Sequence, residues 1–442
     1  MPITCIGLSH HTAPVEVRER HAFPPSRMAE ALVALRDYEA VQEAVMLQTC
    51  GRLEIYAELD DYEGGVAQIK SFLANFRHGT TGYDLESYLY TRLGHQAVEH
   101  LFRVCTGLDS MLIGEAEILG QVKDAYVAAT QAKSLGRTLH RLFREALAAG
   151  KRARAQTRIG GESVSIATAA VEAACATLGT LEGKSILVLG AGKMGRTAVK
   201  RLRQEGAARV IVVNRTISRS RELVIEAGFG EAVEMPELVE AMAVADVIVA
   251  STGASHFVLN EERVHAAMAQ RPDRALFIVD IAVPRDADPA VTNVANVALV
   301  DIDGLKSLVN ERLELRREAI PAVEAIIGES VERFESWYRS RVAVPVIARL
   351  TQKAEAIRAA ELERLLARCP QLDERERMLV TGMTMTIVSK LLHSVILKIR
   401  EKATLDHAEA LSSARVLDEL FELDLADQIA GTIRNSLPDS GE

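Results

Sequence analysis

The stretch that most constrains the fold is SILVLGAGKMGRTAV, residues 185–199, in which an apolar run ends in glycines and a helical segment follows. Four further apolar runs come later, separated by helical patterns: RVIVVN, DVIVAS, LFIVDIAV and VALVDI. Continuous apolar strands that alternate with helices are typical of a parallel sheet covered on both faces. We therefore predict a doubly wound α/β domain in this part of the chain.

The motif GAGKMG, residues 190–195, predicts a dinucleotide site in that domain. G-x-G-x-x-G is a weak signal alone, but here it follows a strand and opens a helix, which is the context that supports it. Gly190 permits the turn, Gly192 lets the backbone approach a pyrophosphate, and Gly195 allows close packing of helix on strand. The helix N-terminus then faces the phosphates. The candidate cofactor loop is completed by Ala191, Lys193 and Met194.

The end of the next strand predicts which dinucleotide binds. A site for NAD usually has Asp or Glu there, whereas this chain has Asn214, Arg215 and Thr216, with Arg219 and Arg221 just beyond. A guanidinium and a hydroxyl suit a 2′-phosphate, and no carboxylate is placed to repel it. We therefore predict NADP(H).

The regions on either side have different patterns. The first 160 residues mix short apolar strands with helical stretches and end in a long basic helix, after which GGES at 160–163 marks a boundary. After Gly304 the strands stop. Residues 306–344 are almost free of glycine, which predicts a long helix with a kink at Pro321 and an end near Pro345.

We therefore predict a multidomain α/β chain with four parts: an α+β domain over 1–159, a Rossmann domain over 160–304, a long connecting helix over 305–345 and an all-α domain over 346–442. A length of 442 residues suits such a division, because a single core stops growing at about 250–300 residues. The helical region cannot bury its wide apolar stripes alone, so we expect it to form a homodimer.

Composition and charge limit the class of protein. No apolar run approaches the roughly 20 residues needed to cross a bilayer, so we expect a cytoplasmic chain without a membrane segment. The net charge is −9, yet residues 136–160 carry seven basic residues against one acidic, and residues 341–402 carry twelve against seven. Local basic faces can meet a nucleic acid despite an acidic total. A solvated helix face is an equal alternative for the second segment.

Five cysteines, odd in number and without a CxxC pair, indicate neither a disulfide framework nor a zinc cluster. Cys50 stands apart because it lies in a break, T-C-G-R, between two probable strands. Arg52, two residues away, could lower the pKa of the thiol and hold a substrate carboxylate. From the residues alone, a nucleophile and a structural thiol are about equally supported. The other cysteines lie in strands or helices or beside a proline: Cys5, Cys105, Cys175 and Cys369.

Several stretches occur in a fixed order along the chain: GLSHHTAPVEVRE from Gly7, QTCGRLEIY from Gln48, AVEHLFRVCTGLDSMLIGEAEILGQVKDAY from Ala97, GKRARAQTRIG from Gly150, then GAGKMG, NRT and DIAVPRD at 280–286. Together they closely resemble the glutamyl-tRNA reductase family. The likeness runs through the first three hundred residues and continues more weakly in the helical remainder.

The resemblance implies a reaction. In that family a cysteine thiolate attacks the aminoacyl ester of glutamyl-tRNA, and NADPH reduces the resulting thioester to glutamate-1-semialdehyde, which opens tetrapyrrole (5-aminolevulinate and porphyrin) biosynthesis. Cys50 would be the nucleophile, and His100 matches the histidine near the reacting centre. A thioester accepts hydride more readily than an oxygen ester, and covalent capture divides one difficult step into two. Transient docking with glutamate-1-semialdehyde aminomutase is a further expectation.

The resemblance also implies substrate contacts in the turn around Cys50 and in the stretch after His100: Thr49, Gly51, Arg52, Ser110, Glu115, Ala116, Glu117 and Gln121. Two motifs depart from the family pattern: T-C-G-R at Gly51, and GEAEILGQ at Ala116 and Glu117, where GEPQILGQ is usual. The family commonly has asparagine at the position of Gly51 and glutamine at that of Glu117. Glu117 adds a negative charge near an acidic substrate, so it either binds the substrate ammonium or faces away. The basic helix over 136–158 is the expected contact for the tRNA acceptor end.

Two other interpretations stay open. GAG and NRT features also occur in shikimate dehydrogenases, so the chain could be an NADP-dependent oxidoreductase of a small molecule, but this leaves the helical region and the Cys50 turn unexplained. A noncatalytic RNA-binding or scaffold protein could keep the nucleotide domain as a sensor, although intact Cys50, His100 and GAGKMG argue against it.

Overall fold

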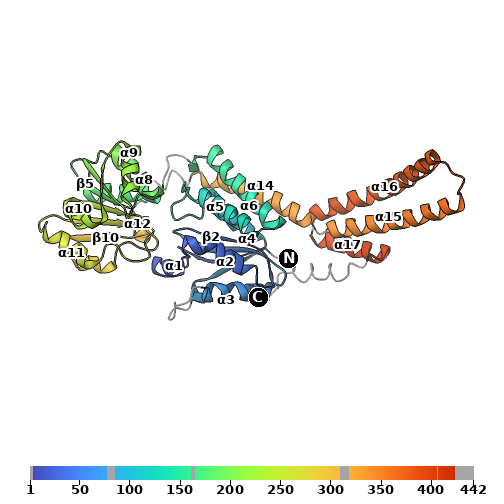
Figure 1. Cartoon of the computed structure of the whole chain (residues 1–442), viewed down its shortest axis with the longest axis horizontal. Helices are drawn as coiled ribbons and strands as arrows, with labels where there is room; N and C mark the ends of the chain where they lie inside the picture. Colours follow the sequence, from blue (N-terminus) through green and yellow to red (C-terminus); the bar gives the residue numbers. More distant parts are fainter. Residues whose placement is uncertain are drawn as a thin grey trace. The chain divides into compact units, whose positions relative to one another are not determined.

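A computed structural model describes residues 3–76, 85–160, 165–308, 318–341, 343–405 and 407–423. The chain divides into two compact units. The larger contains Ile3–Leu59 and Glu63–Gly328, and the smaller contains Asp60–Tyr62 and Glu329–Glu442. The elements of both are labelled in Figure 1.

The larger unit begins with a four-stranded antiparallel sheet in the order β2-β3-β1-β4. Its strands are β1 (Ile3–Ser9), β2 (Val41–Gln48), β3 (Arg52–Leu59) and β4 (Tyr90–Leu93). β1 and β3 are buried along their whole length. β2 and β3 form a hairpin whose last described pair is Gln48 with Leu53, so the predicted break between two strands is confirmed as a tight turn.

In the described residues of this region, the sheet is accompanied by α1 (Val15–His21), α2 (Met28–Leu35), α3 (Tyr62–Asn75), α4 (His95–Thr106), α5 (Ile118–Gln131) and α6 (Arg137–Gln156). α6 is the predicted basic helix. Its buried residues recur three or four positions apart, as at Leu139, Leu142, Phe143 and Ala146, so one stripe packs inward and the other faces remain for charged side chains.

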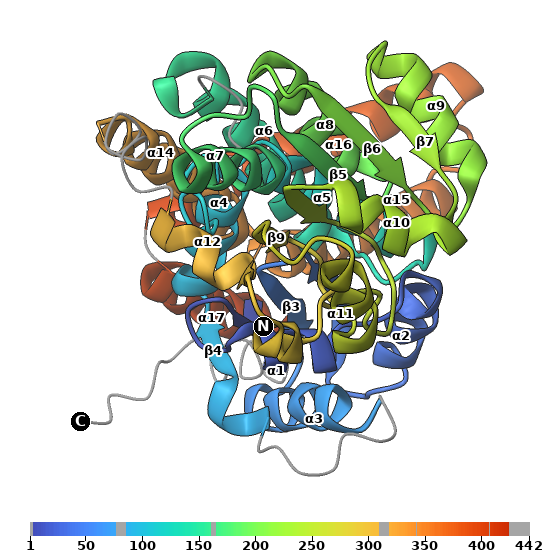
Figure 2. The same cartoon turned by 90° about the vertical axis from the view of Figure 1, so that its left-hand side faces the viewer.

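The second part of this unit is a six-stranded parallel sheet in the order β10-β9-β8-β5-β6-β7, seen from one side in Figure 2. Its strands are β5 (Ser185–Leu189), β6 (Arg209–Val213), β7 (Glu231–Val233), β8 (Val247–Ala250), β9 (Leu276–Asp280) and β10 (Val297–Val300). Its helices are α7 (Ile166–Leu178), α8 (Lys193–Gln204), α9 (Ile217–Ala227), α10 (Leu238–Val244), α11 (Glu261–Ala269) and α12 (Ile302–Leu308).

Alternate side chains of β5 enter two separate cores on opposite faces of this sheet, Ile186 and Val188 in one and Leu187 and Leu189 in the other. The predicted doubly wound fold is therefore confirmed. The three-residue strand β7 was not among the predicted runs, because EAV is too short to stand out in a periodic pattern. Short 3-10 turns complete the unit: Pro25–Arg27, Leu85–Tyr88, Arg158–Gly160, Met235–Glu237 and Pro289–Asn293.

The predicted single helix over 306–344 is wrong in detail. Residues 309–317 lie outside the described residues, α14 (Ile320–Ser340) begins beyond them, and α15 (Ala343–Arg368) follows after a turn at Arg341. Pro321 and Pro345 each fall in the first turn of a helix, where the missing N–H has no intrahelical partner to lose. Neither proline therefore kinks or ends the helix that contains it.

The smaller unit consists mainly of α15, α16 (Glu374–Leu405) and α17 (His407–Phe421). Its buried core is small: Ala343, Val346, Leu350, Ile399 and Leu423. Many large apolar side chains of α16 are instead exposed, among them Met378, Leu379, Met383, Met385, Ile387 and Leu391. An exposed apolar surface of this extent indicates an interaction site.

Helix α16 contains a segment that contradicts the expectation of no membrane-length apolar stretch. The segment Glu374–Ile399 is long and apolar enough to cross a bilayer, with a mean hydropathy of 1.4, although the sequence was expected to contain no such run. The expectation failed because Lys390 and His393 interrupt the apolar run in the middle of α16, although the segment as a whole is apolar enough. Length and composition alone do not separate a bilayer span from a helix face that another protein covers.

Candidate functional site

Cys50 lies in the turn between β2 and β3, and hydrogen bonds hold this turn on both sides. Thr49 N–H donates to Arg52 O (2.9 Å), Gly51 N–H donates to Thr49 Oγ1 (3.1 Å), and His10 N–H donates to Gly51 O (2.8 Å). The thiol is half-buried and packs against the apolar core beneath the parallel sheet. A fixed turn that leaves a thiol partly exposed is a suitable mount for a nucleophile.

The cation that acts on the thiol is Arg18 of α1, not Arg52 as predicted. Arg18 is 3% exposed, and its guanidinium donates to Cys50 O, to a carboxylate oxygen of Asp303 and to Ala13 O (3.1 Å). Burial and the carboxylate of Glu115 nevertheless raise the pKa of the Cys50 thiol above its usual range, against the lowering by Arg18. In these surroundings burial and the nearby carboxylate favour the thiol over the thiolate.

Arg52 instead belongs to a buried cluster around Glu54. Its Nη1 lies 2.6 Å from Glu54 Oε1 and 2.9 Å from Asp109 Oδ2. His100 Nε2 lies 2.9 Å from the same Glu54 oxygen, and the hydroxyl of Tyr90 donates to it at 2.5 Å. Burial opposes ionisation of Glu54, but the charges of Arg52 and His100 hold its pKa well below its usual range. Arg52 and His100 are thus locked in place by one carboxylate.

Cys5, Glu54 and His100 offer ligand atoms within 4.8 Å of one another, a spacing that could hold a metal ion. Glu54 already accepts hydrogen bonds from Arg52, Tyr56 (2.7 Å) and Tyr90, and Cys5 is fully buried. The donors and charges present satisfy the carboxylate, so this cluster fits a hydrogen-bond network better than a metal centre.

The loop after α4 contributes three buried polar side chains: Ser110, Glu115 and Glu117, at 7%, 4% and 6% exposure. Within the described part of the chain, Ser110 Oγ and Glu115 Oε1 are buried without a hydrogen-bond partner. Burial and the neighbouring Glu117 raise the pKa of Glu115 to about 7. Because buried polar atoms are usually hydrogen-bonded, these two atoms without a partner are available to bind a ligand. Ala116 and Gln121 are half-buried in the same segment.

Gly51 and Glu117 depart from the family pattern, and the structure shows what surrounds each of them. A Cβ atom on Gly51 would lie 3.6 Å from His10 Nδ1 and 3.9 Å from Thr49 Oγ1, which is ordinary contact, so the turn has room for a side chain there. Glu117 faces the cofactor loop, where Lys193 Nζ lies 3.8 Å from its carboxylate. Lys193 therefore supplies a positive charge beside the Glu117 carboxylate within the protein.

The cofactor loop has the geometry that GAGKMG predicts. Gly190 has φ +110°, and a Cβ there would meet Ser251 O at 2.8 Å. A Cβ on Gly195 would lie 2.0 Å from Gly190 O, whereas the space around Gly192 is open to 4 Å. α8 begins at Lys193 and directs its N-terminal N–H groups to this open space. These residues fit a dinucleotide pyrophosphate.

The other predicted cofactor residues divide into two groups. Ala191 is buried, so its backbone is the part that can reach a ligand, and Met194 is half-buried and packs against the core. Asn214 Oδ1 accepts from Ala191 N–H at 3.5 Å, which connects the two loops, and Arg215 and Thr216 are exposed. Exposed side chains at the end of β6 are placed to meet the ribose end of a dinucleotide.

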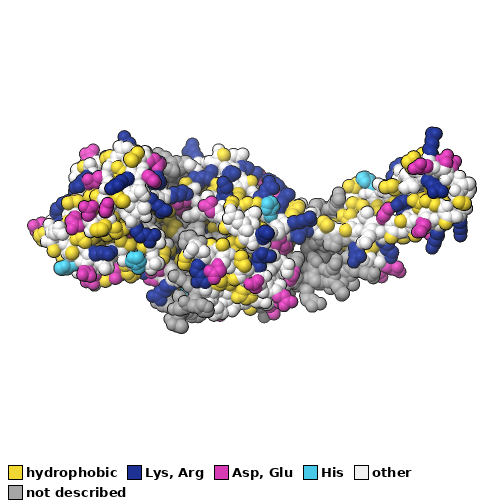
Figure 3. Space-filling model, in the orientation of Figure 1, with side chains coloured by type: hydrophobic (Ala, Val, Ile, Leu, Met, Phe, Trp, Pro, Cys, Tyr) yellow, Lys and Arg dark blue, Asp and Glu magenta, His cyan; other side chains and the backbone are white. Residues whose placement is uncertain are grey.

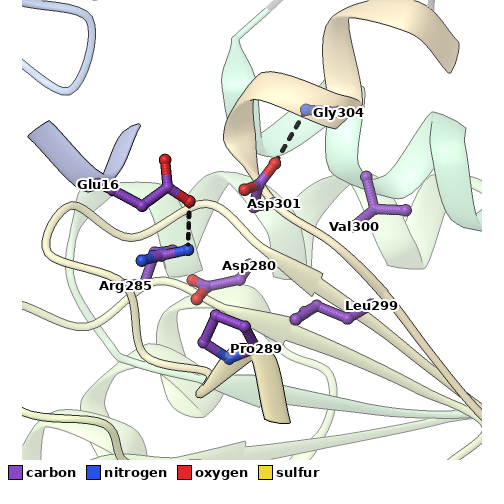
Figure 4. A pocket seen from close by; sticks show the side chains of 8 residues that line it. All are labelled: Glu16, Asp280, Arg285, Pro289, Leu299, Val300, Asp301 and Gly304. Carbon is purple, nitrogen blue, oxygen red and sulfur yellow. Dashed lines mark hydrogen bonds and ion pairs between the residues drawn. The ribbon is translucent and has the colours of Figure 1, made fainter. Parts of the chain in front are cut away.

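Sequence reasoning missed a set of hydrogen bonds that fixes the loops following β8 and β9. Asp286 accepts from the N–H of Thr252 at 2.7 Å and from its hydroxyl, and Asp280 accepts from three backbone N–H groups. Burial raises the pKa of Asp280 to about 7. Asp280 lines a cavity of about 520 Å³ together with Glu16, Arg285 and Asp301 (Figure 4). Arg285 and both aspartates lie in the DIAVPRD stretch, which signalled resemblance but not these contacts.

A second cavity, of about 360 Å³, lies beside the Cys50 turn. It is lined by His10, His11, Thr12, Ala13, Pro14, Met111 and Asp303. Its residues come from the GLSHHTAP stretch, from the segment between α4 and α5, and from α12, so both the first domain and the cofactor domain line it.

Three family models match this chain. "Glutamyl-tRNAGlu reductase, N-terminal domain" matches residues 6–157, "Shikimate / quinate 5-dehydrogenase" matches 172–308, and "Glutamyl-tRNAGlu reductase, dimerisation domain" matches 322–423. The dehydrogenase model covers only the parallel-sheet domain, which supports a nicotinamide cofactor. Because reductase models match on both sides of it, the alternative of a shikimate-type enzyme is not supported.

Similar proteins match over nearly the full length. Glutamyl-tRNA reductase of Bacillus subtilis is 40% identical over 438 residues, covering 99% of this chain and 95% of that protein. Glutamyl-tRNA reductase of Desulforudis audaxviator is 43% identical over 425 residues, covering 96% and 94%. The solved structure of glutamyl-tRNA reductase from Methanopyrus kandleri is 34% identical with a TM-score of 0.51, covering 96% and 99%. The chain therefore belongs to the glutamyl-tRNA reductase family and is an oxidoreductase.

Proposed function

We propose that this chain reduces glutamyl-tRNA(Glu) to glutamate-1-semialdehyde with NADPH, through a thioester on Cys50. The observation that carries the proposal is the Cys50 thiol itself, held on a rigid turn between two buried strands and close to Glu115. The product is a precursor of 5-aminolevulinate and hence of tetrapyrroles.

In the first step the Cys50 thiolate attacks the ester carbonyl carbon. A bond forms between Sγ and that carbon, the bond to the ribose oxygen of the tRNA breaks, and the ribose leaves as a hydroxyl after it takes a proton. His100, held by Glu54, orients the ester or moves this proton. Ser110 and Thr49 offer hydroxyls to the glutamyl group.

Substrate binding itself can produce the thiolate. The substrate carries an ammonium group, and Glu115 has a buried carboxylate oxygen that no described residue bonds. Burial is the main cause of the raised pKa of Cys50, and the carboxylate of Glu115 comes next; an ammonium on Glu115 offsets this second cause and so favours the thiolate. Because Arg52 is paired with Glu54 and Asp109, its part is to fix the pocket wall rather than to hold a free carboxylate bidentately.

NADPH, when bound, supplies the hydride that reduces the thioester. The backbone N–H groups at Gly192 and Lys193 hold its pyrophosphate, and Arg215 and Thr216 receive the 2′-phosphate. When the carbon–sulfur bond breaks, the sulfur of Cys50 leaves as thiolate and is ready for another turn.

The tRNA is held by a stripe of cations. Arg137, Arg144, Lys151 and Arg158 are exposed and spaced by seven residues, which is two helical turns, so those on α6 share one face. The other basic residues of the segment are engaged within the protein, as in Arg141 with Glu145 and Arg154 with Glu115 O (3.1 Å). Figure 3 shows Lys and Arg side chains gathered over this region.

Two copies of the chain form a homodimer through the exposed apolar face of α16. This pairing covers the segment that could otherwise cross a bilayer, and it leaves a cytoplasmic enzyme. Docking with glutamate-1-semialdehyde aminomutase protects the unstable aldehyde and remains part of the proposal.

The test is NADPH oxidation by the full chain with glutamyl-tRNA(Glu), uncharged tRNA or shikimate as substrate. We expect oxidation only with charged tRNA, loss of it in Cys50→Ser, and retention in Cys175→Ser, a half-buried cysteine on α7. Full activity in Cys50→Ser would reject the nucleophile, and oxidation with shikimate alone would reject the substrate.

A further inference from the structure

Helix α1 connects the Cys50 turn to the cofactor domain. Arg18 of this helix donates to Cys50 O and to one carboxylate oxygen of Asp303, a residue of α12. Val15 N–H donates to the other oxygen of Asp303 at 2.9 Å. The residues that these bonds join are far apart in sequence, so the contact exists only in the folded chain.

The same helix is also fastened by Arg285, through Glu16 and Glu19, which alternate along α1 with Val15 and Arg18. The guanidinium of Arg285 lies 2.9 Å from Glu19 Oε1 and 2.7 Å from Glu16 Oε1, and its backbone N–H donates to Glu19 at 3.0 Å. Figure 4 shows the contact with Glu16 at the edge of the cavity. Arg285 contacts only α1 in these bonds and does not reach Cys50, so the two fastenings of α1 can be altered separately.

Burial of the Arg18 guanidinium costs free energy of folding unless all its partners are present. The side chain is 3% exposed, and a buried guanidinium needs both hydrogen bonds and a compensating charge. Cys50 O and Ala13 O supply acceptors from the first domain, and Asp303 supplies the charge from the cofactor domain. A shift of either domain would leave a buried charge uncompensated, so Arg18 favours the one arrangement in which both contacts are made.

We propose that Arg18 is a positioning residue that fixes the Cys50 turn relative to the cofactor domain through Asp303. It holds the carbonyl of the nucleophilic residue rather than the substrate, and it keeps a positive charge beneath the thiol. The hydride acceptor on Cys50 is thereby kept in register with the edge of the parallel sheet where the nicotinamide binds. The effect of Arg18 on the reduction step rests on the proposed function, whereas its effect on the reactivity of the Cys50 thiol does not.

The first test measures thiol reactivity in the full-length dimer. Alkylation of Cys50 by iodoacetamide is followed at the Cys50 peptide by mass spectrometry between pH 6 and 10. We expect Arg18→Gln to slow alkylation about tenfold at pH 8, since each unit of raised pKa lowers the thiolate fraction tenfold. Arg18→Lys restores most of the rate because the charge returns. Glu19→Gln, the matched control, weakens the Arg285 fastening of α1 and leaves the rate unchanged.

The second test measures the two chemical steps in single turnover with glutamyl-tRNA. Asp303→Asn keeps the charge of Arg18 but weakens its tie to the cofactor domain. We expect tRNA release at the rate of the wild type and NADPH oxidation slowed at least tenfold, with the glutamyl-tRNA concentration that gives half-maximal rate of tRNA release unchanged.

Three results would overturn the inference: a wild-type alkylation profile in Arg18→Gln, equal slowing in Glu19→Gln, or wild-type rates of both steps in Asp303→Asn. The two proposals fail separately. Full activity in Cys50→Ser would reject Cys50 as the nucleophile of the proposed function, but it would leave the alkylation rates of Cys50 in the Arg18 variants unchanged. If Arg18→Gln does not fold by circular dichroism, Arg18→Lys and Asp303→Asn decide.

Discussion

The carboxyl group of Glu115 makes the stability of this protein depend on pH. The side chain is 4% exposed, and burial with the nearby Glu117 raises its pKa from 4.5 to about 7. Between these values the folded chain holds a proton that the unfolded chain has released, so the free energy of unfolding falls as pH rises through this window. A difference of about 2.5 pKa units amounts to about 3 kcal/mol of stability lost above pH 7.

Replacement of Glu115 by glutamine removes this titration with little change of shape. We expect Glu115→Gln to raise the free energy of unfolding by about 3 kcal/mol at pH 8 and by less than about 1 kcal/mol at pH 5. The measurement is urea-dependent hydrogen exchange of peptides from β2 and β3 at fixed protein concentration, corrected for the intrinsic effect of pH on exchange.

The matched control is Asp124→Asn, which removes an exposed carboxyl from α5. We expect it to change the free energy of unfolding by less than about 0.5 kcal/mol at both pH values, as is usual for surface substitutions. An equal effect of Glu115→Gln at pH 5 and pH 8 would refute the raised pKa of Glu115. It would also weaken the proposal that substrate binding at Glu115 favours the Cys50 thiolate.

The remaining predictions concern the cofactor, the tRNA and the dimer. Gly195→Ala places a methyl group 2.0 Å from Gly190 O, so NADPH binding measured by fluorescence titration should be lost while the chain stays folded. Arg215→Glu should weaken NADPH binding at least tenfold and leave NADH binding nearly unchanged; equal loss of both would contradict the assigned 2′-phosphate contact. Lys151→Gln should weaken tRNA binding and lower the slope of log K against log salt by about one. Leu391→Glu should convert the dimer to monomers in light scattering, because it places a charge on the apolar face of α16.

The sequence was most informative where a pattern is local. The run SILVL followed by GAGKMG predicted a strand, a turn and a helix N-terminus, and each is present because these features depend on near neighbours only. The T-C-G-R break between two probable strands predicted a tight turn at Cys50, which the pairing of β2 with β3 confirms. The two prolines were misplaced because proline is compatible with a first helical turn as well as with a break.

The electrostatics of the site could not be predicted in this way. Arg52 was the nearest cation to Cys50 in sequence, yet the guanidinium that reaches the turn is that of Arg18, brought there from 32 residues away and compensated by Asp303 from 285 residues away. The pairing of Arg52 with Glu54 likewise depends on burial of the whole cluster. Long-range pairs of buried charges leave no periodic signal in a single sequence.

The central claim is that the glutamyl group passes through a thioester on Cys50. The most direct measurement mixes the full chain with radiolabelled glutamyl-tRNA in the absence of NADPH, quenches in acid and locates the label by peptide mass spectrometry. We predict one glutamyl group on the Cys50 peptide, released by hydroxylamine, discharged when NADPH is added before the quench, and missing in Cys50→Ser. Semialdehyde formation without a labelled Cys50 peptide, or a label on another residue, would contradict the account.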